Sequence, residues 1–165
     1  FRVNFCYRAG TCRHFINMGA AMRDSDYDDN SSQAVFRVAL AVAFSDDLLD
    51  HEEQAKVEDV YRNILVRMDE YDEDGDLEEE TESIAQDVMN ALADAESESE
   101  RQELYEEWGE VIVDPDLQEI ALAAAVLIAG EDADIDPVES ACMAAFCEHW
   151  GLDFEDMLAS FARPD

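Results

Sequence analysis

Two stretches decide the fold: residues 33–60 read QAVFRVALAVAFSDDLLDHEEQAKVEDV, and residues 119–146 read EIALAAAVLIAGEDADIDPVESACMAAF. Each begins with an apolar run, is broken by an acidic segment, and continues with apolar residues at helical spacing. Moving the first stretch forward by 86 residues superimposes alanines, acidic residues and apolar residues at the same helix break. Such self-similarity predicts two helix–acidic loop–helix units, about 33–68 and 117–154, related by a pseudo-twofold axis.

The rest of the chain also has helical patterns. The expected helices are 33–44, 51–68, 77–95, 99–112, 115–129, 137–150 and 152–162. Asp114 as N-cap and Pro115 at the first helical position predict where the fifth helix begins. The inward face of the third helix is expected to hold Ile84, Val88, Met89 and Leu92. We therefore predict an all-α fold of about seven helices, with a single helical domain, 33–165, after a basic arm and polar linker, 1–32.

The charge of the chain limits its partners. Among 165 residues there are 43 acidic and 10 basic ones, for a formal net charge of −33, and Lys56 is the single lysine. Such a surface repels phosphate groups, so we expect no direct binding of nucleic acid. It favours cations, a basic protein surface or a high-salt environment. Residues 1–23 are different because they hold four arginines and no acidic residue. Either this arm lies on the acidic body or it holds a partner.

The sequence shows few signals for membrane insertion, secretion or cysteine chemistry. The longest apolar run, 120–129, is far below the roughly 20 residues of a membrane helix, so no membrane span is expected. No secretory signal is present, which favours the cytoplasm or an organelle interior, and the start at Phe1 suggests processing or trimming upstream. The four cysteines match no metal-binding spacing: Cys6, Cys12, Cys142 and Cys147. We expect reduced thiols, with a disulfide between the first two as the alternative.

Both acidic loops combine helix caps with carboxylates that a cap does not explain. Two pairs have the spacing of a capping box: Asp50 with Glu53, and Asp136 with Glu139. Asp46 and Asp132 instead follow the end of a helix, where its dipole disfavours negative charge by roughly 0.3–1 kcal/mol. A bound divalent cation would offset this cost, because Ca²⁺ and Mg²⁺ prefer oxygen ligands. Solvation by water and counterions is the alternative.

The two loops resemble those of a known family. LAVAFSDDLLDHEEQAKVEDVYRNI and VLIAGEDADIDPVESACMAAFCEHWGLD are similar to the repeat of TerB-like tellurite-resistance proteins, with an A-x-x-D-G-x-[IL]-x-x-x-E type of loop. The resemblance covers about 33–64 and 117–162, and Asp47 and Ala133 stand where the family has Gly. It implies an all-helical fold and a non-enzymatic role in a stress or metal response. It also implies metal ligands at Asp46, Asp50, Glu53, Asp132, Asp136 and Glu139.

A third acidic segment, EYDEDGDL from Glu70, resembles an EF-hand loop because Gly75 occupies position 6 and an apolar residue position 8. It departs from that motif at position 1, which is not Asp, and at position 12, which is Thr81. The secondary metal candidates are Glu70, Asp72, Asp74 and Asp76. A solvated acidic turn is the alternative, and the following run 78–82 is expected to be a solvated helix start.

No Ser–His–Asp or Cys–His spacing indicates a nucleophile, so we expect a protein that is not an enzyme. The favoured interpretation is an acidic helical binding module for a divalent cation, Ca²⁺ or Mg²⁺, or for a basic partner. A structural or docking subunit of a larger assembly is the second interpretation. A weaker third one is an acidic mimic of nucleic acid phosphates.

Overall fold

Seven helices make up the described part of the chain, and no strand occurs there. The computed structural model describes residues 30–45, 51–73, 75–129, 135 and 137–161. The helices are α1 Ser32–Ala43, α2 His51–Arg67, α3 Leu77–Asp94, α4 Glu98–Glu110, α5 Pro115–Ala129, α6 Pro137–Trp150 and α7 Phe154–Phe161. The predicted all-α fold is therefore confirmed. The described helices contain none that is both long and apolar enough to cross a membrane.

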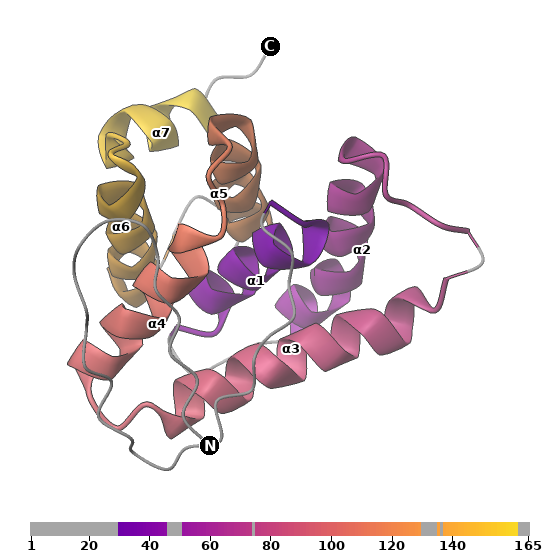
Figure 1. Cartoon of the computed structure of the whole chain (residues 1–165), viewed down its shortest axis with the longest axis horizontal. Helices are drawn as coiled ribbons and strands as arrows, with labels where there is room; N and C mark the ends of the chain where they lie inside the picture. The colour runs from indigo at the N-terminus through magenta and orange to yellow at the C-terminus, as the bar shows by residue number, and fades with distance from the viewer. Residues whose placement is uncertain (1–29, 46–50, 74, 130–134, 136, 162–165) are drawn as a thin grey trace, which may run out of the picture.

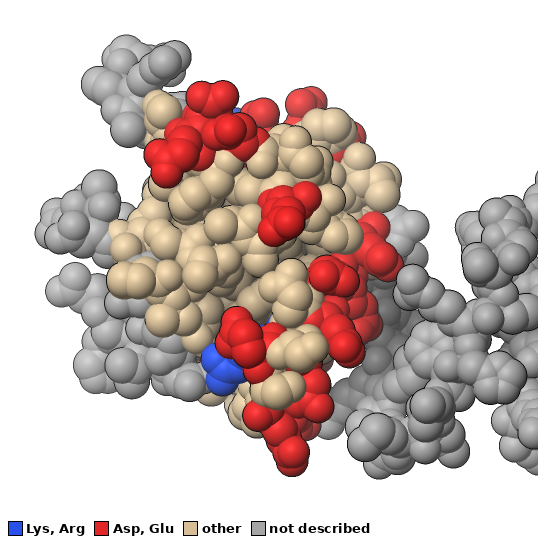
Figure 2. Space-filling view, turned by 90° about the vertical axis from the view of Figure 1, so that its left-hand side faces the viewer, with Lys and Arg blue, Asp and Glu red and all other residues tan. Residues whose placement is uncertain are grey.

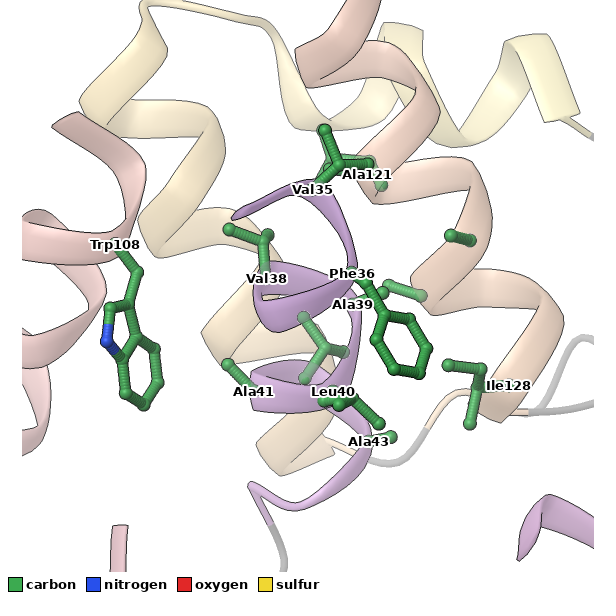
Figure 3. Close-up of a cluster of buried hydrophobic side chains, with 14 of the residues drawn as sticks. Val35, Phe36, Val38, Ala39, Leu40, Ala41, Ala43, Trp108, Ala121 and Ile128 are labelled. Atoms are coloured by element: carbon green, nitrogen blue, oxygen red, sulfur yellow. The ribbon is translucent and has the colours of Figure 1, made fainter. Parts of the chain in front are cut away.

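Helix α1 forms the centre of the core, and α2 to α6 all pack against it (Figure 1). Its sequence is apolar on nearly every face, and a helix of that kind is stable only when it is enclosed. Phe36 and Leu40 are completely buried, and α5 covers one side of them with Ile128 (Figure 3). On another side the Arg37 guanidinium lies 5.8 Å from the centre of the Trp108 ring.

Side-chain caps set the starts of several helices. The Ser31 hydroxyl accepts from the Ala34 amide at 3.1 Å and so begins α1. Ser97 and Glu100 form a reciprocal capping box at α4. Each such cap stabilises a helix by about 1 kcal/mol. The last helix begins at Phe154 rather than at the expected residue 152, because Asp153 caps it through a 2.9 Å bond to the Asp156 amide.

Two further details of the sequence prediction need correction. Met89 is 44% exposed, because Val88 fills the inner face of α3 and its neighbour points about 100° away. Helix α4 ends at Glu110, two residues before the expected end. Just before that end, Gly109 leaves no room for a side chain, since a Cβ there would lie 2.9 Å from His149 Cδ2. The Trp150 indole also donates to the Gly109 carbonyl at 3.0 Å.

The helices of the two predicted repeat units, α1–α2 and α5–α6, contact one another. Helix α1 packs against α5, while α2 packs across onto α5 and α6 packs across onto α1. Superposition of 33–46 and 51–68 on 119–132 and 137–154 stays a prediction.

Candidate functional site

Most of the loop carboxylates predicted to bind metal lie outside the described residues. This applies to Asp46, Asp50, Asp132 and Asp136, and to the side chain of Glu53 in α2. Glu139 is described: it lies in the first turn of α6 and is 4% exposed. Burial is the main cause that raises the pKa of the nearby Cys142 thiol, and the charge of Glu139 adds to it. That these six carboxylates act as metal ligands stays a prediction.

The second predicted set, in the turn between α2 and α3, is described except for Asp74. Asp76 is the N-cap of α3, since its carboxylate accepts from the Glu79 amide at 3.2 Å. Glu70 and Asp72 are exposed. The described residues contain no group of three or more His, Cys, Asp or Glu side chains arranged to hold a metal ion. Within the turn, the described residues have the arrangement of a capped acidic turn.

A Schellman motif at the end of α2 positions this turn. The Glu70 amide donates to the Leu65 carbonyl at 2.9 Å, and the Asp69 amide donates to the Val66 carbonyl at 3.3 Å. Asp69 has a φ of 59°, in the left-handed region that such a helix end requires. The motif reverses the chain and brings Glu70 and Asp72 over the start of α1.

Between this turn and the start of α1 lies a cavity of about 320 Å³, here called the Glu80 cavity. Its walls are residues 31–33, Leu65, 70–72, Gly75, Leu77 and Glu80. A second hollow, of about 340 Å³, lies beside it and shares Gln33 and Glu80 with it. The Glu80 side chain therefore stands between two hollows, and the walls of the first carry three carboxylates.

The Glu80 carboxylate is held from two other helices. Its Oε1 accepts from Gln33 Nε2 of α1 at 2.5 Å and from the Tyr61 hydroxyl of α2 at 2.8 Å. Tyr61 is fully buried, its ring stacks on Phe36 at 4.4 Å, and its side chain also hydrogen-bonds Ser32. Burial, followed by the bond to Glu80, raises the pKa of Tyr61, so its hydroxyl stays a donor at neutral pH. Three helices thus orient one anionic group.

The sequence prediction missed Glu80. It was placed in a solvated acidic helix start, 78–82, whereas the structure packs it against α1 and α2. One signal was available: Thr81 and Ile84 are buried on the inner side of α3, and Glu80 borders that side. The partner residues come from separate helices, and single-sequence periodicity does not show such contacts.

The two buried thiols of α6 are poor nucleophiles at neutral pH. Burial raises the pKa of Cys142 to about 12 and that of Cys147 to about 11, which keeps both protonated at neutral pH. The Cys142 thiol lies 3.7 Å from the Ala41 carbonyl and hydrogen-bonds Tyr105. Both thiols are free, in agreement with the expectation for this pair. Cys6 and Cys12 lie outside the described residues.

Comparisons with family models, with curated proteins and with solved structures give no match. The resemblance to TerB-like proteins therefore stays an inference from the two loop motifs.

Proposed function

We propose that the chain is a non-catalytic acidic binding module, and that the Glu80 cavity receives a basic side chain of a protein partner. The observation that carries this proposal is the Glu80 carboxylate, which Tyr61 and Gln33 orient at the wall of a cavity. Glu70 and Asp72 bring two more carboxylates to the same walls. An arginine or lysine head group meets its charge complement there, and charge-assisted bonds are roughly twice as strong as neutral ones.

The size and lining of the cavity suit a side chain. Its volume of about 320 Å³ is at the small end of the roughly 300–1,000 Å³ range of ligand sites. Leu65, Leu77 and the half-exposed ring of Tyr71 line it along with the acids. Apolar walls of this kind contact the methylene stem of a long basic side chain while the carboxylates receive its head.

The pKa values of the described residues support a non-catalytic role. The thiols of Cys142 and Cys147 and the phenols of Tyr61 and Tyr105 all have a raised pKa, with burial as the main cause. A catalytic nucleophile needs the opposite shift, toward easier deprotonation. These groups are thus suited to packing and to donating hydrogen bonds.

Divalent-cation binding at the paired acidic loops is the second candidate function. The observation that favours it is the repeat, which places Asp46 and Asp132 at corresponding helix ends. The TerB-like resemblance supports the same function and a role in a stress or metal response. Under this second proposal the module binds Ca²⁺ or Mg²⁺ through two sets of carboxylates: Asp46, Asp50 and Glu53 in the first loop, and Asp132, Asp136 and Glu139 in the second.

An NMR titration of the full chain tests the cavity. An arginine-rich peptide, CaCl₂ and MgCl₂ are titrated separately into ¹⁵N-labelled protein at constant ionic strength. The peptide should shift the amide signals of Leu65, Gly75 and Leu77 in a saturable way. The variant Glu70→Gln with Asp72→Asn should bind it more weakly, by a larger factor than the control Asp94→Asn with Glu96→Gln.

The control removes the same charge from exposed positions at the other end of α3. Equal weakening in both variants would mean diffuse electrostatic attraction and would refute the cavity as the site. If Ca²⁺ or Mg²⁺ shifts the cavity signals and the peptide does not, the cavity binds an ion and not a side chain.

A further inference from the structure

The N-terminal arm enters the described structure at a fixed point. The Asn30 amide donates to the Val111 carbonyl at 2.9 Å, and Asn30 Oδ1 accepts from the amides of Val113 and Asp114 at 2.9 and 3.1 Å. Asn30 has a φ of 59°, a conformation that asparagine tolerates better than most residues. These three bonds attach residue 30 to the junction between α4 and α5. The preceding residues, 1–29, are therefore tethered to that junction.

Beside that junction lies a surface formed by α4 and α6, here called the α4–α6 face. The two helices pack together through Tyr105 and Phe146, whose rings are 5.5 Å apart. On α6, Val138 is 47% exposed, Ala141 is exposed and Ala145 is half-buried. This outer side of α6 carries no charge from Pro137 to Ala145, which is unusual in a chain with a net charge of −33.

Carboxylates border this uncharged area. Helix α4 exposes six carboxylates, and four of them lie in its last eight residues, at Glu103, Glu106, Glu107 and Glu110. Figure 2 views the side of the molecule on which α4 and α6 lie and shows a broad surface of uncharged residues, with one acidic group near its middle and others along its margins. An apolar centre with a charged rim is the usual composition of a protein interface. The complementary ligand has apolar side chains and basic residues, and lacks acids.

Residues 1–23 have that composition. They contain Arg2, Arg8, Arg13 and Arg23, no acidic residue, and a series of large apolar side chains: Phe1, Phe5, Tyr7, Phe15 and Ile16. The linker 24–29 joins them to the attachment point at Asn30. Six linker residues extend up to ~20 Å, which is about the length of α4, at 13 residues and 1.5 Å of rise each. The arm therefore reaches the whole face.

We propose that residues 1–23 dock in cis on the α4–α6 face, with their arginines against the α4 carboxylates and their apolar side chains against the uncharged side of α6. Charge complementarity and the attachment at Asn30 select this occupant over a second copy, which would bring another strongly negative surface. This inference is independent of the function proposed for the Glu80 cavity.

Paramagnetic relaxation enhancement on the full chain tests this docking. The native Cys6 and Cys12 are reduced and labelled with a nitroxide, while Cys142 and Cys147 are 3% and 1% exposed and should stay unlabelled. Mass spectrometry checks that two labels are present. Amide signals of Ala141, Ala145 and Glu106 should lose intensity selectively. Signals of Val66 and Met89, on α2 and α3, serve as the reference.

Variants of the chain then test whether the selective loss of signal comes from docking of the arm or only from its attachment near the face. Replacing the four arginines of the arm with Gln should abolish the selective loss, and Glu106→Gln with Glu107→Gln should weaken it. Glu78→Gln with Glu82→Gln, which removes the same charge from the start of α3, should leave it unchanged. Equal loss of signal at Met89 and Ala141, or loss centred on Gly75 of the Glu80 cavity, would overturn the proposal. So would loss in a sample that mixes spin-labelled protein with separate ¹⁵N-labelled protein, because that result assigns the face to a second copy.

Discussion

Removing one hydroxyl from the core should measure how firmly Glu80 is held. In Tyr61→Phe the ring keeps its stack on Phe36, while the 2.8 Å hydrogen bond to Glu80 is lost. A hydrogen bond to a charged group contributes about 1.5–3 kcal/mol. Glu80 is half-buried and keeps its bond to Gln33, so the lower part of that range applies. We expect a loss of about 1.5–2 kcal/mol in the free energy of unfolding.

The assay is urea denaturation of the full chain followed by circular dichroism. A double-mutant cycle with Glu80→Gln should give a coupling energy of about 1 kcal/mol, within the usual range for residues in contact. The control Glu78→Gln removes the same charge from an exposed position and should leave stability unchanged or slightly raised, because it reduces self-repulsion. Additive effects of Tyr61→Phe and Glu80→Gln would refute the idea that Tyr61 orients this carboxylate.

Three further predictions concern salt, divalent cations and pH. Monovalent salt should raise the melting temperature by screening a net charge of −33, and flat melting from low to high salt in calorimetry would mean that the charges are already compensated. Millimolar Ca²⁺ or Mg²⁺ should stabilise the domain more than sodium at equal ionic strength, by about 2.7 kcal/mol at one hundred times Kd. Asp46→Asn with Asp132→Asn should remove this increment, and a full response in that variant would exclude the paired loops as the site. The free energy of unfolding should fall as pH rises above 9, because the unfolded chain loses thiol protons near the ordinary pKa of 9.0 whereas folded Cys142 and Cys147 hold theirs to about 12 and 11. In Cys142→Ala with Cys147→Ala, denaturation curves measured between pH 8 and 10 should show a shallower fall, and an unchanged slope would contradict the burial effect.

The helices were predictable because their signals are local. Apolar spacing located each helix, and Asp114 with Pro115 marked the start of α5 at the residue where the structure begins it. Met89 was misplaced because it adjoins Val88 in sequence, and spacing alone does not decide which of two neighbours faces the core. Helix ends were less certain, because they depend on contacts such as that between Gly109 and His149.

The candidate site was only partly predictable. The turn that carries Glu70 and Asp72 was identified from its acidic residues and glycine, and Asp76 proved to be a cap. The partners of Glu80 come from α1 and α2, separated from it by 47 and 19 residues, so no local pattern joins them. Hydrogen bonds across such separations are a product of tertiary packing.

The enclosure of α1 by five later helices has a consequence for how the chain is made. During synthesis α1 leaves the ribosome before α2, α3, α4, α5 and α6. Its apolar faces therefore have no packing partners until segments up to about 100 residues downstream have been made. Long-range contacts of this kind form slowly, and an exposed apolar helix is prone to aggregate in the meantime. Acidic residues lie on both sides of it, in 24–29 and 46–53. Charges that flank an apolar segment act as gatekeepers against association, so the acidity of this chain protects its nascent form as well as shaping its folded surface.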